Sequence, residues 1–399
     1  MPVSVDSVWK TLIDEQIVAG EDAAVLRRAF DDSPQAKQDV RGLLEWLVQS
    51  QMVTPYQAAG LAGDARRRLT AGPYQILERV NQGRLTGLFR ARHAQLRVPV
   101  CLQLVNPNGA PAEIENQMLR LQREARVSVQ LNHPNIVRMF QVGRIGQLYF
   151  LAFESLRGSS LLDLLDANSV MDTGTYSFAI DVWDLSRGQT NPEIVCRLIH
   201  DAALGLAHLH EQGVVHRNIS PHNLWVTEDG RVKIMDFGLA RDALSFLDEP
   251  RHPPLESQEE EEFVGTPDYT APEQALDSGS VGPAADIYSL GCTLYHALTG
   301  NVPFSALTPS KTMILHAMQN ATPPSRENRV VSPELDAIVL KMMAKRPADR
   351  YAAALEVAAA LEPFARHGDH VLETQPSSEE FQSFLDWLNE QGPVLAPVE

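Results

Sequence analysis

The fold is decided by a stretch that reads His216-Arg217-Asn218-Ile219-Ser220-Pro221-His222-Asn223 and ends, after two apolar runs, in Asp236-Phe237-Gly238. The apolar runs, 224–227 and 232–235, are joined by the polar turn 228–230, a pattern that predicts a β-hairpin. A hairpin brings both of its ends to one edge. We therefore expect the oxygen atoms of Asn223 and Asp236 to lie close together, as a hard cation such as Mg²⁺ requires. The alternative is that both motifs are ordinary loop residues.

This stretch resembles the catalytic loop and the metal-binding D-F-G of the bacterial eukaryotic-like Ser/Thr protein kinases, whose pattern is H-R-D-x-K-x-x-N and then D-F-G. Two positions depart from the pattern. Asn218 stands where the family has its catalytic Asp, and Ser220 stands where it has a Lys. The resemblance implies an α+β, bilobal protein-kinase-like fold with a small β-rich N-lobe and a helical C-lobe. The two departures put the reaction in question.

Composition narrows the class of protein. The chain has 399 residues, of which 44% are hydrophobic and 21% charged, as expected for a globular protein with a large core. A net charge of −17 argues against nucleic acid or an anionic membrane as a partner. Three widely spaced cysteines suggest neither a zinc site nor a disulfide framework, and no apolar run is long enough to span a membrane. We expect a cytoplasmic protein.

Residues 1–70 read as a separate all-helical module. The segment 12–26 resembles 47–61 at an offset of 35 residues, with six of fifteen positions identical. This predicts a helix, a break at Gly20 or Pro55 and a second helix, repeated twice, with chance similarity of Ala/Leu/Gln-rich helices as the alternative. The module's expected task is protein contact. The segment from Arg66 to Pro73, with 71–73 as its end, reads as a solvated basic hinge.

From Tyr74 the pattern is that of a small antiparallel sheet, which we take as the N-lobe, 74–153. By the resemblance, the first hairpin should carry G-x-G-x-x-G, but only Gly83 remains. Gln103 occupies the position of the phosphate-gripping Lys. Glu124, on an expected helix over 113–130, occupies the position of that lysine's Glu partner, and it either hydrogen-bonds Gln103 or is solvated. Phe153 is the expected gatekeeper before a hinge at 154–156.

The C-lobe, 157–363, carries a further departure beside the central stretch. Trp225 stands where the family has a Leu-sized floor for the adenine pocket, and its bulk disfavours adenine there. The alternative is a shifted hairpin in which Trp225 points elsewhere. Residues 166–192 exceed what the family places here and suggest a surface insertion that contacts a partner.

The resemblance extends through G-T-x-x-Y-x-A-P-E at 265–273, which includes Thr266 as a regulatory position. An acidic run at 256–262 precedes it. We hypothesise that one of its carboxylates pairs with Arg217 in place of an activating phosphate, the alternative being a solvated run. The scaffold positions of the family are all retained, namely His216, Glu273, Asp286 and Arg350.

The tail, 364–399, is acidic and contains Phe381, Phe384, Leu385 and Leu388 at helical spacing after a capping-box-like Ser377 and Glu380. This predicts a short amphipathic helix over 378–389 that packs back on the kinase-like domain or docks in a partner's groove.

The sequence thus predicts a kinase-like domain over 74–363 that keeps its scaffold and metal ligands, Asn223 and Asp236, but lacks its chemical groups. We interpret it as a pseudokinase acting as a regulatory or scaffold protein in signalling. Weak ATP- and Mg²⁺-dependent Ser/Thr kinase activity and another ATP-dependent transfer are the alternatives, so ATP and Mg²⁺ stay open as ligands.

Overall fold

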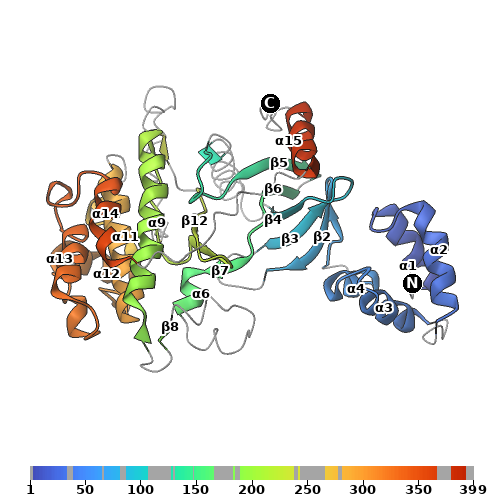
Figure 1. Ribbon diagram of the computed structural model, residues 1–399, viewed down its shortest axis with the longest axis horizontal. Helices are drawn as coiled ribbons and strands as arrows, with labels where there is room; N and C mark the ends of the chain where they lie inside the picture. Colours follow the sequence, from blue (N-terminus) through green and yellow to red (C-terminus); the bar gives the residue numbers. More distant parts are fainter. Residues whose placement is uncertain are drawn as a thin grey trace.

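The computed structural model describes residues 3–33, 39–64, 67–80, 87–106, 127–128, 131–146, 148–165, 183–184, 189–237, 241–242, 266–276, 281–365 and 379–391. Several predicted features lie outside them: Gly83, Glu124, the acidic run 256–262 and most of the insertion 166–192. In the described part, a four-helix module precedes a curled antiparallel sheet, and a mainly helical lobe follows it (Figure 1). This is the predicted two-lobed fold.

The N-terminal module consists of α1 (Val5–Asp14), α2 (Gly20–Asp31), α3 (Val40–Gln49) and α4 (Pro55–Leu61). The second pair begins 35 residues after the first, helix for helix. The breaks also match, because Gln16 and Gln51 both have a left-handed backbone, with φ of 54° and 56°. The apolar faces of all four helices meet in one core that buries Leu12, Leu43 and Leu47 completely.

The prediction of a solvated hinge after this module is wrong for Thr70 and Ala71. Thr70–Ala71 form strand β1, which pairs antiparallel with β2 (Tyr74–Arg79). Leu69 is buried in the core of the module, whereas Ala71 is buried in the core of the sheet. The preceding Arg67 and Arg68 are exposed, as a basic hinge requires. The two parts are thus joined by a tight connection whose apolar residues belong to both cores.

Side chains of α4 fasten the module to the edge of the sheet. The buried Gln57 donates its Nε2 to the carbonyl of Ile76 at 2.9 Å, and Thr54 Oγ1 donates to the carbonyl of Leu77. Tyr56 packs edge-on against Phe89 at a ring distance of 5.9 Å. Both main-chain bonds use carbonyls that strand pairing leaves free, so α4 caps part of the sheet's edge.

The N-lobe sheet has the strand order β1-β2-β3-β4-β6-β5. Its further strands are β3 (Leu88–His93), β4 (Pro99–Val105), β5 (Met139–Ile145) and β6 (Leu148–Glu154). One face of the sheet contributes to a core with Trp225 from the C-lobe, and the other face contributes to a core with Phe384 from the C-terminal region. Because successive side chains of a strand point to opposite faces, the strands of this sheet contribute residues to two separate cores.

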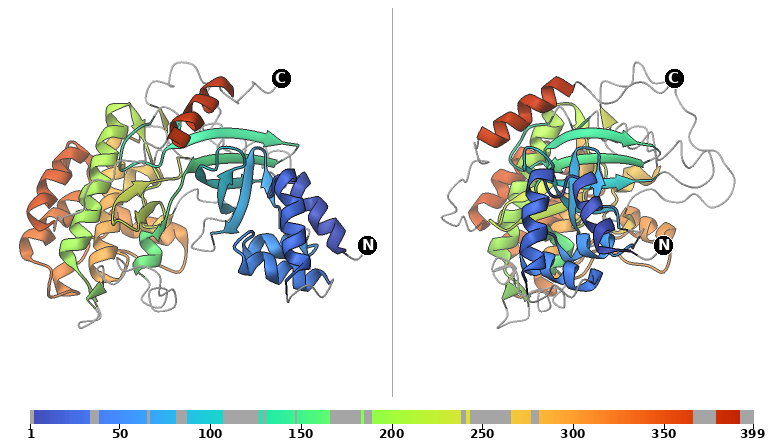
Figure 2. Two further views of the ribbon diagram at one scale, coloured as in Figure 1. Left: turned by 45° about the vertical axis from the view of Figure 1, so that its right-hand side comes forward. Right: turned by 90° about the vertical axis from the view of Figure 1, so that its right-hand side faces the viewer.

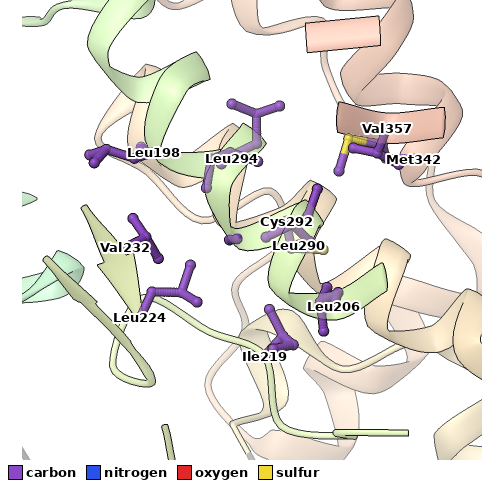
Figure 3. Packing of buried hydrophobic residues seen from close by; sticks show 14 of the residues in the cluster. Leu198, Leu206, Ile219, Leu224, Val232, Leu290, Cys292, Leu294, Met342 and Val357 are labelled. Carbon is purple, nitrogen blue, oxygen red and sulfur yellow. The ribbon is translucent and has the colours of Figure 1, made fainter. Parts of the chain in front are cut away.

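The C-lobe is built around α9 (Pro192–Glu211) and α11 (Pro283–Thr299), which pack against each other and against α14 (Ala354–Leu361). Helix α11 is buried on nearly all sides, and Gly291 allows Met342 to approach closely, because a Cβ there would lie 2.8 Å from the Met342 Cβ. Figure 3 shows Leu198 and Leu206 of α9 beside Leu290 and Leu294 of α11.

The remaining helical elements described in this lobe are α6 (Leu161–Leu165), η2 (Pro267–Tyr269), α10 (Pro272–Leu276), α12 (Pro309–Met318), η3 (Pro324–Arg326), α13 (Pro333–Met342), η4 (Pro347–Asp349) and η5 (Glu362–Phe364). Its strands are β7 (Gly158–Ser160), β8 (Trp183–Asp184), β9 (Gln189–Thr190), β10 (Val214–Val215), β11 (Leu224–Thr227), β12 (Val232–Ile234) and β13 (Arg241–Asp242). Strands β12, β11 and β7 form a small sheet under the N-lobe.

The predicted amphipathic helix is present as α15 (Glu379–Gln391), and it packs on the N-lobe, the first of the two alternatives. Phe384 is fully buried, with its ring 5.3 Å from Phe140 and 5.7 Å from His93. Trp387 lies 4.5 Å from His93. Figure 2 shows the helical module and α15 against the same lobe. In the part of the chain that is described, no helix combines the length and apolarity needed to cross a bilayer.

Candidate functional site

The hairpin predicted from the sequence is formed by β11 and β12, which pair antiparallel with Leu224 opposite Ile234 and Val226 opposite Val232. The bond from Met235 N–H to the Asn223 carbonyl, 3.0 Å, extends the pairing by one step. Asn223 and Asp236 therefore leave the hairpin at the same edge. Their two side chains are the predicted metal ligands.

The loop before β11 is held by one buried carboxylate. Asp286 Oδ2 accepts from the His216 N–H at 2.9 Å, and Oδ1 accepts from the Arg217 N–H at 2.7 Å. His210 Nε2 lies 2.8 Å from Oδ2. Burial alone would raise the pKa of Asp286, but the hydrogen bond from His210 and the other donors outweigh it and lower the pKa. Asp286 is thus a charged anchor for the loop backbone.

The backbone is strained at two positions of the site, one in this loop and one just after β12. Arg217 has a φ of 68° and Asp236 a φ of 67°, which are unfavourable for residues with a Cβ. At the first position, Gln274 Nε2 supports the strained peptide by donating to the Arg217 carbonyl at 3.0 Å. Near the second, His216 Nε2 lies 3.1 Å from the Met235 carbonyl. The hydrogen bonds of the loop stabilise a backbone that would not persist alone.

Asn218, Asn223 and Asp236 form one hydrogen-bonded group. Asn218 Nδ2 donates to Asp236 Oδ2 at 3.2 Å, and Asn223 Nδ2 donates to the Asn218 carbonyl at 2.8 Å. An aspartate at position 218 could not make the first bond, because two carboxylates would repel each other. The amide of Asn218 therefore acts as a donor toward Asp236, a predicted metal ligand, whereas a carboxylate at this position could only accept. Ser220 is fully buried, and its Oγ has no hydrogen-bond partner among the described residues.

The donor set fits a hard divalent cation only in part. Asn223 donates its Nδ2 to the Asn218 carbonyl, so Oδ1 is the atom of this side chain that could bind a cation, and the Asp236 carboxylate would be the second ligand. Two oxygen ligands with water and phosphate oxygens completing the shell are typical of Mg²⁺. Within the described residues, no group of three or more His, Cys, Asp or Glu side chains could hold a metal.

Trp225 fills the space between the lobes. Its side chain is 1% exposed and belongs to a cluster with Cys101, Phe153 and Leu156, so it points up to the N-lobe as predicted. The indole Nε1 is buried without a hydrogen-bond partner among the described residues, an arrangement that costs roughly 1–3 kcal/mol. Adjacent hydrophobic packing offsets that cost.

The hinge of the cleft is occupied by contacts within the chain. The Leu156 N–H donates to Cys101 Sγ at 3.4 Å, so this main-chain donor already has a partner. Burial raises the pKa of the Cys101 thiol to about 11, which keeps it neutral. Glu154, the first hinge residue, forms an ion pair with Lys233 of β12 at 2.8 Å and accepts from the Arg138 N–H. The Leu156 N–H and the Glu154 carboxylate are thus both engaged by partners within the chain.

Lys233 does not take the place of the strand lysine that Gln103 replaces. Gln103 lies on β4 opposite Leu151. Glu124, its expected partner, lies outside the described residues. Lys233 is the one Lys between Lys37 and Lys311 in the sequence. It is committed to Glu154, so it does not replace the missing charge at Gln103.

The retained scaffold positions form their expected contacts. Arg350 makes two bonds to the Glu273 carboxylate, of 2.6 and 2.8 Å, and also donates to the carbonyls of Ala284, Ala344 and Lys345. Thr266 lies just before η2, and its carbonyl accepts from the Tyr269 N–H. The acidic residues proposed to pair with Arg217 lie outside the described residues.

Sequence reasoning missed three contacts of the site: Lys233 with Glu154, Leu156 with Cys101, and His210 with Asp286. A signal existed for the first, because an isolated lysine in a strand beside the cleft demands a counter-charge. Nothing in the local sequence pointed to the other two.

Comparison with known proteins agrees with this geometry. The sequence-family model of the protein kinase domain matches residues 74–360 of this chain. Serine/threonine-protein kinase PknB of Mycolicibacterium smegmatis is 32% identical over 292 residues, which cover 72% of this chain and 42% of that protein. PknB of Mycobacterium tuberculosis H37Rv is 31% identical with the same coverage. The probable serine/threonine-protein kinase CE0033 of Corynebacterium efficiens is 31% identical over 74% of this chain and 42% of its own length.

The chain therefore spans less than half the length of these curated relatives. With the two-lobed fold, the catalytic-loop hairpin and a match over most of its length, the chain belongs to the protein kinase family, among the bacterial eukaryotic-like Ser/Thr kinases.

Proposed function

We propose that this protein is a catalytically impaired kinase-like regulator, a pseudokinase that works through protein contacts. The single observation that carries the proposal is Trp225, buried between the lobes against Cys101 and Phe153. Its indole fills the space that a planar base would need. The hinge donor of Leu156, already bonded to Cys101, supports the same conclusion.

The reacting groups support the proposal independently. Family kinases turn over at roughly 1–100 per second by positioning and electrostatic stabilisation. Loss of a general base costs about 10²–10⁴-fold, and loss of one preorganised electrostatic group costs about 10²–10³-fold, although such losses do not add. Asn218 donates to Asp236 and accepts no proton, and Gln103 supplies no positive charge. Either loss alone takes turnover below a useful signalling rate.

A second candidate is a weak Ser/Thr kinase, which the hydrogen-bonded group of Asn218, Asn223 and Asp236 favours. If Mg²⁺ binds, Asn223 Oδ1 and Asp236 would hold it, and it would neutralise phosphate charge. Another ATP-dependent transfer on the same ligands is the third candidate. The regulatory role is assigned to surfaces outside the cleft, such as the module formed by residues 1–70.

The test is a pair of measurements on the intact chain. Thermal unfolding in millimolar ATP, with and without Mg²⁺, is expected to show no shift of Tm, whereas a saturating ligand at 100 times its Kd adds about 2.7 kcal/mol. Incubation with γ-phosphate-labelled ATP and with α-phosphate-labelled ATP is expected to label nothing. A Mg²⁺-dependent Tm shift with γ-labelling would establish the kinase instead, and labelling only from the α position would establish nucleotidyl transfer.

A further inference from the structure

Helix α15 covers a histidine of the N-lobe sheet. His93, the last residue of β3, is 1% exposed, and its ring lies 5.7 Å from Phe384 and 4.5 Å from Trp387 of α15. A third aromatic neighbour, Tyr74 at 5.6 Å, belongs to the sheet itself. Two of these three rings would therefore leave together with α15 if the helix detached, and water would then reach the imidazole from that side.

The hydrogen bonds of the covered ring suit only its neutral form. His93 Nδ1 accepts from the Leu96 N–H at 3.1 Å, which places the proton of the neutral ring on Nε2. Nε2 is buried and has no hydrogen-bond partner among the described residues. A second proton on Nδ1 would point at the N–H of Leu96, so the charged ring would hold two buried donors without an acceptor. The docked position of α15 is therefore unfavourable for an imidazolium.

The charged groups of the surrounding elements do not offset this cost. They are Asp14 and Glu15 of α1, Tyr74 of β2, Arg92 and Arg97 of the hairpin that contains His93, and Asp386 of α15. Of the three carboxylates, Glu15 accepts from the Thr70 hydroxyl and the other two are exposed. Burial raises the pKa of Tyr74, so its phenol stays neutral, and the two arginines offer an imidazolium no counter-charge.

We propose that α15 is a detachable latch, which stays on the N-lobe while His93 is neutral and is released when His93 takes up a proton. Burial under α15 lowers the pKa of His93, whereas the uncovered ring titrates near the ordinary value of about 6.5. Docking is therefore strongest above that pH and weakens as the pH falls below it. Release uncovers Phe140 together with His93, and it does not depend on whether the cleft binds ATP.

The experiment is hydrogen–deuterium exchange of the intact chain, read at the amides of α15 at three pH values of about 7.5, 6.5 and 5.5. Division by the intrinsic exchange rate at each pH leaves the opening constant of the helix. Uptake of one proton on release should raise this constant about tenfold between the highest and the lowest pH. The internal reference is α3, which contains no histidine because His93 is the first in the sequence, and its opening constant should change less than about twofold.

The deciding variant is His93→Asn, because the side-chain oxygen of Asn can accept from the Leu96 N–H and the amide does not titrate. Its α15 should open equally at all three pH values. If α15 of this variant is already open at the highest pH, His93→Gln takes its place. The matched control is His133→Asn. His133 Nδ1 likewise accepts a main-chain N–H, that of Asn135 at 3.1 Å, and burial lowers its pKa, but its ring stacks on His208 of α9. The control should keep the full pH dependence of α15.

Several results would overturn the proposal. An opening constant of α15 that does not change with pH in the wild type would do so, as would the same rise in His93→Asn or the loss of the rise in His133→Asn. An equal rise in α3 and α15 would mean that acid loosens the whole protein and not the latch. An opening constant that falls in acid would mean that cation–π attraction to the Trp387 ring holds the charged imidazole in place, which is the opposite of release.

Discussion

Replacing Trp225 by alanine would convert the filled cleft into a cavity, and the structure fixes the expected cost. Truncation of a fully buried Trp loses roughly 3–5 kcal/mol. The same change removes an indole N–H that has no partner among the described residues, which returns about 1–3 kcal/mol. The net loss is therefore about 2 kcal/mol, or about 3 °C in Tm for a domain of this size.

The opened cleft should then respond to nucleotide. ATP at 100 times its Kd contributes about 2.7 kcal/mol, which is enough to restore the Tm lost by the substitution. The assay is thermal unfolding of the wild type and of Trp225→Ala over a titration of ATP with Mg²⁺. Adding Cys101→Ala to the variant releases the Leu156 N–H and should strengthen the response further.

The matched control is Leu151→Ala. Leu151 is fully buried in the same cluster but lies on the N-lobe sheet, so its truncation should also cost about 2–5 kcal/mol without creating a response to ATP. Rescue of both variants by ATP, or of neither, would refute the argument that the indole is what excludes nucleotide. A response of the wild type equal to that of Trp225→Ala would refute it as well.

Three further predictions concern the rest of the domain. Asn218→Asp replaces a hydrogen bond to Asp236 with repulsion between two carboxylates, so the Tm of the variant should fall without metal and rise when Mg²⁺ is added. A Tm that responds to Mg²⁺ no more than that of the wild type would contradict the proposed ligand pair. Arg350→Ala leaves Glu273 without its bidentate partner and should lower the free energy of unfolding by about 3–5 kcal/mol in urea titrations, with Arg350→Lys intermediate. The hydrogen bond to the neighbouring Asp201 carboxylate raises the pKa of His200, outweighing burial. The stabilisation that protonated His200 gives the fold is therefore full below the unfolded-state pKa of about 6.5 and is lost as pH rises through the folded-state pKa. His200→Gln should lower Tm at pH 5.5 and leave it nearly unchanged at pH 8.5.

The sequence predicted structure correctly where the residue pattern within a single segment determines the structure of that segment. The hairpin of β11 and β12 follows from two β-type runs around a polar turn, and α15 follows from a stripe of apolar residues at helical spacing. The orientation of Trp225 follows from its place in that hairpin. In each case the pattern repeats over several residues, so local packing and register leave few alternatives.

What the sequence could not supply depends on residues far apart in the chain. Lys233 and Glu154 are 79 residues apart, and Leu156 and Cys101 are 55 residues apart, so neither pairing has a local pattern. Strand β1 was missed for a related reason, because its two residues acquire β structure only by pairing with Tyr74 and Gln75. A stretch with no periodicity of its own reads as a hinge until the neighbouring strand is placed.

The docking of α15 has a consequence for the order in which the protein is completed during synthesis. His93 and Phe140 reach the ribosome exit long before Phe384, the residue that covers them. At about 5–20 residues per second, the roughly 290 residues between His93 and Phe384 take about 15–60 seconds to translate. For that time the N-lobe presents an uncovered aromatic face to solvent or to chaperones, while the helical lobe is still being made. The same face, uncovered by a nonsense mutation after the C-lobe, would make a truncated chain prone to aggregation even though its cores were otherwise complete.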